Sequence, residues 1–291
     1  MDFAVYYDNQ KKIIEDFLQK RIAKKGISKV DEAMEYSLLA GGKRIRPVLL
    51  MATAEALGVK GYNFLPVACG LEMIHTYSLI HDDLPCMDND DYRRGRLTNH
   101  KVFGEAMAVL AGDGLLTLAF EVMLEQKNVD PKVLIEVVRE VAMCAGNFGM
   151  VGGQGLDLEN EGKYITAEEL RTMHAGKTGA LFIAAVRSGA RLANASDNEL
   201  LALTKFADLL GLAFQITDDI LDVEGTTEEI GKPAGSDEKN HKSTYVSLYT
   251  LEGAKALAEK TVNEALQCLD IFGENADALR EITKLMCNRK N

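Results

Sequence analysis

The chain of 291 residues is 47% hydrophobic and carries a formal net charge of −11 at pH 7. This acidic balance argues against a nucleic-acid partner, because proteins that bind nucleic acid present a basic face. The five cysteines are scattered and include no C-x-x-C pair, so we expect reduced thiols in a cytoplasmic protein rather than a disulfide framework or a zinc site.

The composition favours helices in one domain. A length prior of about 150 residues per domain would give two domains, but the chain has only five prolines and no Ser/Pro-rich linker. Residues with high helix propensity dominate, and the strict alternation of strands is missing. We therefore expect a single all-α domain over residues 1–291. We expect no signal peptide and no membrane span, because no apolar run approaches the roughly 20 residues that a span needs.

The spacing of apolar residues predicts helices over 11–23, 31–40, 64–83, 104–126 and 131–143, and two more after residue 244. Gly41 ends the second of these, and Pro47 suits the first turn of another helix. Lys43, Arg44 and Arg46 lie between them, where the backbone N–H groups of a helix start favour an anion. Taken alone, such a basic loop is more often solvated surface.

An acidic cluster ends the helix over 64–83. It comprises Asp82, Asp83, Asp88, Asp90 and Asp91, with Arg93, Arg94 and Arg96 directly after it. So many carboxylates suit neither a packed strand nor an apolar helix face, because unpaired buried charges are costly. Oxygen ligands without a zinc-type Cys or His pair favour a hard ion such as Mg²⁺, which shares its shell with substrate phosphates. The arginines suit the same phosphates.

Proline sets the geometry of this cluster. Asp82 and Asp88 are six residues apart, so an unbroken helix would point their side chains in different directions. Pro85 disfavours helical geometry at Leu84. We therefore expect the helix to end near Asp83 and the chain to turn back, which would bring Asp88 beside Asp82.

A second acidic cluster lies at Asp218, Asp219 and Asp222. Asp218 and Asp222 are four residues apart and share one face of a helix, which Gln215 joins three residues before Asp218. Either cluster alone could be a solvated helix end. Two of them, each after an apolar helical stretch and with basic residues elsewhere in the chain, favour a metal site.

Two glycine-containing stretches could suggest a nucleotide-binding loop. The first holds Gly146, Gly149, Gly152, Gly153 and Gly155 but lacks the Gly-Lys-Ser/Thr ending of a P-loop. The second, at Lys177, has that ending, but Arg171 stands where the earlier glycine is required. Close helix packing or a kink is the better prediction for these glycines.

Together these stretches resemble the trans-isoprenyl diphosphate synthases, and most closely their bacterial short-chain farnesyl members. The matching stretches in chain order are 41–47, 72–75, 82–88 with 93–95, 177–179, 218–222, 231–232 and 242–245. The resemblance implies the all-α isoprenoid synthase bundle with a central cavity, and a homodimer. It also implies Mg²⁺-dependent, head-to-tail transfer from dimethylallyl or geranyl diphosphate to isopentenyl diphosphate, which gives farnesyl diphosphate and diphosphate.

The resemblance also assigns roles to residues. Those implied to bind Mg²⁺, as three ions with substrate present, are Asp82, Asp83, Asp88, Asp218, Asp219 and Asp222. Those implied to hold isopentenyl diphosphate are Lys43, Arg46, His75 and Arg94, with Arg44 left as structural. Those implied to stabilise the allylic diphosphate or its cation are Arg93, Lys177, Thr178, Gln215 and Lys242, and Lys232 belongs with Lys242 to a polar loop suited to a lid. The catalytic set is then Asp82, Asp88, Lys177, Gln215 and Asp218.

Product length depends on the wall of the chain pocket. The resemblance places bulky Tyr77 on the pocket floor with small Ser78 beside it, as in farnesyl-type synthases. A helical wheel alone would not do so, because Tyr77 is rotated well away from Asp82. Geranylgeranyl or geranyl diphosphate synthesis is the nearest alternative. A terpene cyclase is disfavoured by the second acidic cluster, and a non-catalytic subunit is disfavoured because both acidic clusters are intact.

Overall fold

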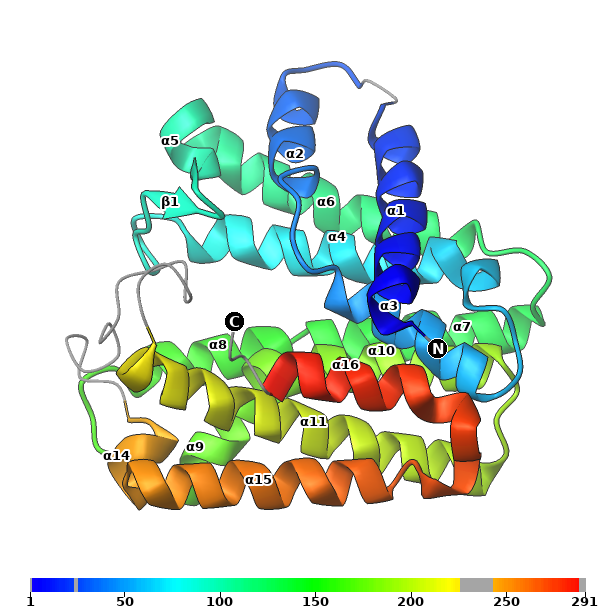
Figure 1. Ribbon diagram of the computed structural model, residues 1–291. Coiled ribbons are helices and arrows are strands. Elements are labelled where there is room, and N and C mark those ends of the chain that lie inside the picture. Colours follow the sequence, from blue (N-terminus) through cyan, green and yellow to red (C-terminus); the bar gives the residue numbers. More distant parts are fainter. Residues whose placement is uncertain (1, 24–25, 226–242, 288–291) are drawn as a thin grey trace.

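The computed structural model describes residues 2–23, 26–225 and 243–287 and is built almost entirely of helices (Figure 1). This confirms the all-α prediction. Its helices are α1 (Phe3–Ile22), α2 (Val30–Leu38), α3 (Ile45–Ala56), η1 (Gly61–Phe64), α4 (Leu65–Asp82), α5 (Asn99–Phe103), α6 (Glu105–Leu124), α7 (Pro131–Ala145), α8 (Met150–Glu159), α9 (Ala167–His174), η2 (Ala175–Gly179), α10 (Ala180–Leu192), α11 (Asp197–Glu224), α14 (Tyr245–Tyr249), α15 (Leu251–Gln267), η3 (Asp270–Ala276) and α16 (Asp277–Cys287). A short antiparallel hairpin, β1 (Tyr92–Arg93) with β2 (Arg96–Leu97), follows α4.

Two groups of helices meet across α3 and α10. In one group α4 lies along α6, and in the other α11 lies along α15; α3 packs on α4 and on α10, and α10 packs on α11 (Figure 1). The core between them is filled by fully buried side chains such as Leu49, Leu50, Leu71, Phe182 and Phe206. Burying such large apolar side chains is the main source of folding free energy.

Polar caps set several helix starts. Thr166 and Ser196 each form a capping box, in which the hydroxyl accepts from the N–H of the third helical residue and a glutamate accepts from the cap N–H. Asp130 caps α7 and is followed directly by Pro131, which is the favoured order at a helix start. These signals explain why α7 begins at its predicted residue.

Helix α1 begins eight residues earlier than predicted. Its start is capped by Asp2, whose carboxylate accepts from the N–H of Val5. The added turns are held by polar contacts, because the Tyr6 hydroxyl donates to Glu55 over 2.6 Å and the Gln10 amide donates to the same carboxylate over 3.1 Å. Apolar spacing does not register such contacts. The C-terminal region likewise has four elements instead of two helices, because α14 and η3 are too short to show a periodic pattern.

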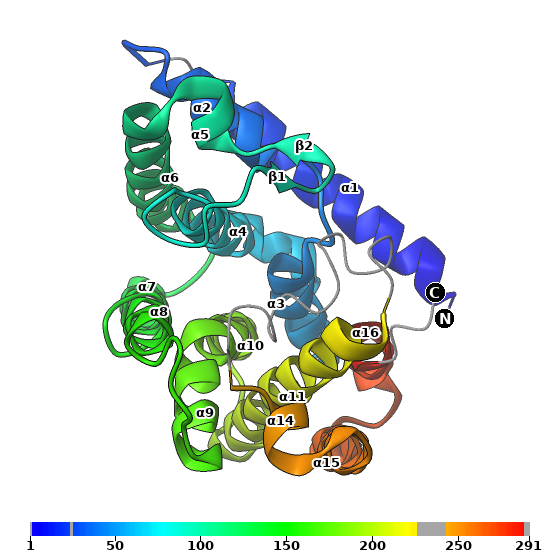
Figure 2. The same ribbon diagram turned by 90° about the vertical axis from the view of Figure 1, so that its left-hand side faces the viewer.

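The C-terminal ends of α4 and α11 lie at the same side of the molecule, at the left in Figure 1 and facing the viewer in Figure 2. Each of these ends carries one of the two acidic clusters. The last carbonyl groups of a helix present a partial negative charge that favours cations. The fold therefore gathers carboxylates and helix C-termini where a cation would be stabilised.

Two helices, α6 and α11, are long and apolar enough to cross a membrane by length and composition alone. The expectation that no apolar stretch of the chain approaches the length of a membrane span is therefore too strict. A core helix of a folded protein passes the same test, and α6 packs along α4 while α11 packs on α10 and α15. Part of α6 stays exposed, including Val109, Leu110 and Leu124.

Candidate active site

The first acidic cluster folds back as its proline predicted. Helix α4 ends at Asp82, and Asp83 is its cap. The N–H of Asp88 then donates to the carbonyl of Asp82 over 2.9 Å. The turn also places Asn89 in the left-handed region at φ 53°, where Asn is one of the better tolerated residues. Asp82 and Asp88 are thereby brought side by side.

The carboxylate of Asp82 is largely buried and lies near charges of both signs. Burial and, to a smaller extent, the charge of Asp88 raise the pKa of Asp82 to about 6, although Lys177 and Arg93 oppose the rise. One of its oxygens accepts a hydrogen bond from the amide of Gln154 over 2.7 Å. A cation placed between Asp82 and Asp88 would relieve both the burial and the repulsion.

Asp83 has a different environment from its neighbour. Its carboxylate is buried and accepts from Nε and Nη2 of Arg93 over 2.7 and 2.5 Å. The two residues between the hairpin strands, Arg94 and Gly95, both have positive φ, as in a type I′ turn. The hairpin so formed carries Arg93 to Asp83. The structure thus pairs Asp83 with Arg93, and the role of Asp83 as a metal ligand stays a prediction.

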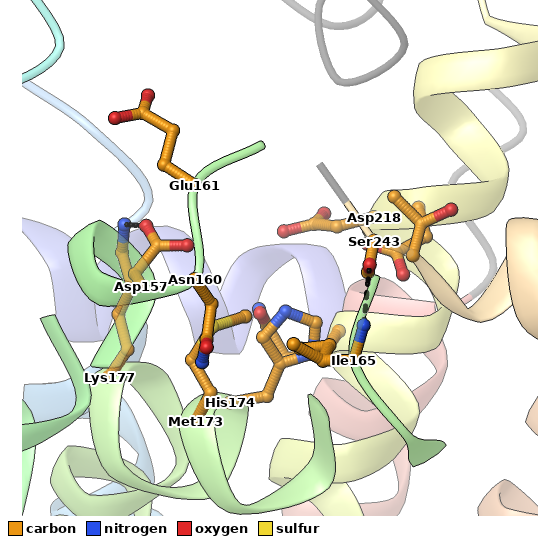
Figure 3. Close-up of a pocket in the computed structure, with 12 residues that line it drawn as sticks. Asp157, Asn160, Glu161, Ile165, Met173, His174, Lys177, Asp218 and Ser243 are labelled. Carbon is orange, nitrogen blue, oxygen red and sulfur yellow. Dashed lines mark hydrogen bonds and ion pairs between the residues drawn. The ribbon is translucent and has the colours of Figure 1, made fainter. Parts of the chain in front are cut away.

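The second cluster faces a cavity of about 170 Å³ whose wall includes Asp218, Asp219, Gln215 and Lys177. Figure 3 shows Asp218 on one side of this cavity and Lys177 on the other. One oxygen of Asp219 accepts from the N–H of Tyr245 over 2.7 Å. Asp222, by contrast, is buried within α11 and does not line the cavity.

The donor set fits an ion that also binds water and substrate. Within the described ranges, no three Asp, Glu, His or Cys side chains gather closely enough to enclose an ion. Mg²⁺ prefers such a setting, since it dehydrates reluctantly and takes one or two carboxylates together with substrate phosphates and water. Asp82 and Asp88 at the end of α4, and Asp218 in the wall of the cavity, supply oxygens of this kind.

Lys177 lies in η2, a single π-helical turn between α9 and α10. Its amino group donates to Asp157 of α8 over 2.6 Å (Figure 3). Burial would lower the pKa of Lys177, but Asp82 and Asp157 outweigh it and hold the pKa above its usual value. The cavity thus keeps a permanent cation opposite Asp218.

Glycine contacts fix η2 against α8. A Cβ on Gly153 would overlap the backbone nitrogen of Lys177, and a Cβ on Gly176 would lie 3.0 Å from the Cα of Gly153. Only glycine allows the two backbones to approach this closely. The glycine-rich stretch is therefore used for close helix packing, which agrees with the interpretation made from the sequence.

The contact makes a testable prediction. Gly153→Ala is expected to lower the free energy of unfolding by about 2–3 kcal/mol, because a methyl group would meet backbone atoms that cannot move aside. Gly155, in the same helix, has open space around its Cα. Gly155→Ala should instead raise stability by about 0.5–1 kcal/mol through helix propensity. Urea denaturation of both variants measures the difference, and equal effects would contradict the packing described.

Three basic side chains, which we call the basic cluster, lie close together: Arg46 of α3, His75 of α4 and Arg94 of the hairpin. The Arg46 guanidinium sits 4.9 Å from the ring centre of Phe182, and burial lowers its pKa to about 10. Burial also lowers the pKa of His75, as do Arg46 and Arg94. Cations crowded so closely repel one another unless an anion binds among them.

The loop before α3 is held from two sides. The Arg94 guanidinium donates to the carbonyl of Gly41 and lies against Gly42. The Tyr7 hydroxyl of α1 donates to the carbonyl of Lys43 over 2.5 Å. The exposed Lys43 side chain thus starts from an anchored backbone close in sequence to Arg46 of the basic cluster.

Arg44 has other partners. It adopts φ 52° as the residue before α3, and its guanidinium donates to buried Glu72 over 2.9 Å and to the Leu38 carbonyl over 2.8 Å. Arg44 is thus held in the core, whereas Arg46, in the first turn of α3, lies on Phe182. The sequence had placed Arg46 in the loop; the structure places it in the helix.

Comparison with known proteins agrees with this arrangement. A family model described as polyprenyl synthetase matches residues 27–286. The chain belongs to the polyprenyl synthetase family. It is 50% identical to the farnesyl diphosphate synthase of Geobacillus stearothermophilus, with 98% of this chain and 97% of the relative covered. It is 46% identical to the geranylgeranyl diphosphate synthase of Cyanophora paradoxa, with coverage of 100% and 97%. A solved geranyltransferase from Legionella pneumophila matches with a TM-score of 0.89 at 34% identity, covering 99% of this chain and 98% of that one.

The remaining predicted site residues of this polyprenyl synthetase lie in varied places. Thr178 follows Lys177 in η2. Tyr77 is buried, and its ring lies nearly perpendicular to that of His81, with the ring centres 5.7 Å apart. The Ser78 hydroxyl donates to the His75 carbonyl over 2.8 Å. Lys232 and Lys242 lie outside the described residues.

Some contacts of this polyprenyl synthetase were not predicted from its sequence. The sequence assigned no role to Gln154 or Asp157, and the structure places both against predicted site residues. The contacts of Tyr7 and Phe182 carried no sequence signal, because an aromatic residue in a helix usually packs in a core.

Proposed function

We propose that this polyprenyl synthetase condenses isopentenyl diphosphate with dimethylallyl or geranyl diphosphate to give farnesyl diphosphate and diphosphate. The observation that carries the proposal is the presence of two different groups of charged side chains, linked by the hairpin that bears Arg93 and Arg94. An acidic site with a lysine opposite suits a metal-bound diphosphate, and a basic cluster suits a second diphosphate without metal.

In the acidic site, Asp82, Asp88 and Asp218 would hold Mg²⁺, three ions in all when substrate is bound. Mg²⁺ there would neutralise the charge that develops on the leaving diphosphate. We assign Asp83, Asp219 and Asp222 to shaping the two clusters, because Asp83 pairs with Arg93, Asp219 holds the Tyr245 N–H and Asp222 is buried.

The reaction breaks the allylic C–O bond, and its electron pair leaves with the diphosphate. Arg93 and Lys177 would stabilise the charge that the leaving oxygens gain more than they would stabilise the bound substrate. Gln215 lines the same cavity as Lys177, and Thr178 follows Lys177 in η2. Both would face the allylic cation, whose lifetime requires that water be excluded. We assign Lys232 and Lys242 to the diphosphate by resemblance.

The second substrate supplies the new bond. Lys43, Arg46, His75 and Arg94 would hold the diphosphate of isopentenyl diphosphate, so that its double bond attacks the allylic cation. The π electrons form the carbon–carbon bond, and a proton is lost to restore a double bond. The released diphosphate is the base that accepts this proton.

Product analysis tests the proposal. Purified protein with Mg²⁺, isopentenyl diphosphate and dimethylallyl diphosphate is expected to yield farnesol after dephosphorylation. Tyr77→Ala should shift the product to longer alcohols, because it removes the bulky ring from the proposed pocket floor. Geranylgeraniol from the unaltered protein would keep the reaction and reject this role for Tyr77, whereas no prenyl alcohol at all would reject the activity.

We further propose that the enzyme acts as a homodimer in the cytoplasm. The exposed apolar side chains of α6, such as Val109 and Leu110, support an association, because contiguous apolar surface favours burial against a partner. Light scattering of the purified protein in the micromolar range measures the mass. A monomer there would reject the dimer.

A further inference from the structure

Helix α8 contacts both sides of the acidic site with one face. The amide of Gln154 donates to Oδ1 of Asp82 over 2.7 Å, and three residues later Asp157 accepts from Nζ of Lys177 over 2.6 Å. Residues three apart on a helix are neighbours on its surface. One rigid element therefore holds a carboxylate from α4 and an amino group from η2.

We propose that Gln154 and Asp157 are positioning residues that fix the Asp82 carboxylate and the Lys177 amino group relative to each other before the allylic diphosphate binds. This inference rests on the proposed function, since it assigns a purpose to contacts within that same site. Neither side chain takes a direct part in the bond breaking described above.

Lys177 needs such a partner because of its own chemistry. A lysine side chain has four rotatable bonds, so it loses much rotamer freedom when its amino group is fixed in one place. Asp82 and Asp88 also attract its charge, yet its ion pair is with Asp157. Without Asp157, the amino group would turn toward Asp82 and compete for oxygens that are needed elsewhere.

The surroundings of Asp157 restrict the position of its ion pair with Lys177. The side chains of Lys177 and Asp157 are only 25% and 13% exposed, so the pair is less screened than a surface ion pair. Gly153, next to Gln154, touches the backbone of Lys177, which fixes the register of α8 against η2. A displacement of about 1 Å at a reacting group can cost on the order of 100-fold in rate.

The sign of the charge makes the inference testable. Asp157 is an anion next to a proposed diphosphate site, so its charge alone opposes binding of the diphosphate. If charge dominated, removal of Asp157 would tighten diphosphate binding. If positioning dominates, the same removal weakens it.

The experiment compares Asp157→Asn with Glu159→Gln, which is the same chemical change at an exposed position of the same helix. Binding of inorganic diphosphate in the presence of Mg²⁺ is measured by titration calorimetry. We expect Asp157→Asn to bind about tenfold more weakly and Glu159→Gln to bind as the unaltered protein does. Unchanged or tighter binding in Asp157→Asn would overturn the inference.

Steady-state kinetics give a second readout. Asp157→Asn is expected to lower kcat/KM for the allylic substrate by about 30-fold and to change KM for isopentenyl diphosphate less than twofold, with partial recovery in Asp157→Glu. In a Lys177→Met background, Asp157→Asn should have no further effect. Additive losses would overturn the inference. An unaltered protein that binds diphosphate but makes no prenyl product would reject the proposed function, while the calorimetric comparison would still decide the role of Asp157.

Discussion

Asp82→Asn is expected to lower kcat for prenyl transfer by about 10²–10³-fold while the chain remains folded. The change removes the charge that would bind Mg²⁺ against the leaving diphosphate, and loss of one such electrostatic group typically costs on the order of 10²–10³ in kcat. The amide oxygen of Asn can still accept from Gln154, so the local contact survives.

Stability should move in the opposite direction from activity. The pKa of Asp82 is raised to about 6, chiefly by burial, so above that pH its ionised form is less favourable in the folded chain than in the unfolded one. A folded-state pKa above the unfolded value means that stability is lost as the pH rises through about 6. Asp82→Asn removes this dependence, and its melting temperature at pH 7.5 without metal should equal or exceed that of the unaltered protein.

Asp90→Asn provides the control, because Asp90 is an exposed carboxylate of the same cluster. It should retain activity within about threefold. Product formation by radiolabelled isopentenyl diphosphate and melting by circular dichroism measure the two quantities. Undiminished turnover in Asp82→Asn would contradict the proposal that Asp82 binds Mg²⁺.

Arg44→Met is expected to cost about 3–5 kcal/mol in the free energy of unfolding. Arg44 and Glu72 are both almost fully buried, and removing one member of a buried ion pair leaves the other charge uncompensated. Replacing Glu72 by Met as well should recover most of the loss, since the double change leaves no buried charge at this pair.

Arg46→Met is the matched substitution two residues later. Its guanidinium is desolvated, lies on Phe182 and has a lowered pKa, so stability should be kept or raised. KM for isopentenyl diphosphate should rise at least about tenfold, because a charge-assisted contact to the diphosphate is lost. Guanidinium denaturation and steady-state kinetics separate the effects, and a stability loss as large as that of Arg44→Met would contradict the division of roles.

The turn in the first acidic cluster was predictable because one residue type dictates it: proline restricts the residue before it, and Asp88 could return only to the end of α4. The different environments of Asp82 and Asp83 were not predictable. Adjacent aspartates are equivalent in a sequence, and only the hairpin that carries Arg93 to Asp83 distinguishes them.

The same limit applies to basic residues. Arg44 and Arg46 share one short stretch, but Arg44, with its left-handed backbone, pairs with Glu72 of α4, whereas Arg46 lies on Phe182 of α10. Periodicity predicts which helices form and where apolar faces lie. It does not predict which charged partners meet across elements, and those pairings decide what each residue of the site does.

The family match begins at residue 27, so α1 lies entirely before it. Yet α1 supplies the Tyr7 hydroxyl beneath Lys43 and two of the groups that contact Glu55. A shortened protein trimmed to the matched segment would keep both acidic clusters and lose the support of the basic loop. Inhibitor screening on such a fragment would thus find compounds that imitate the allylic substrate. It would miss compounds that bind where isopentenyl diphosphate is proposed to bind.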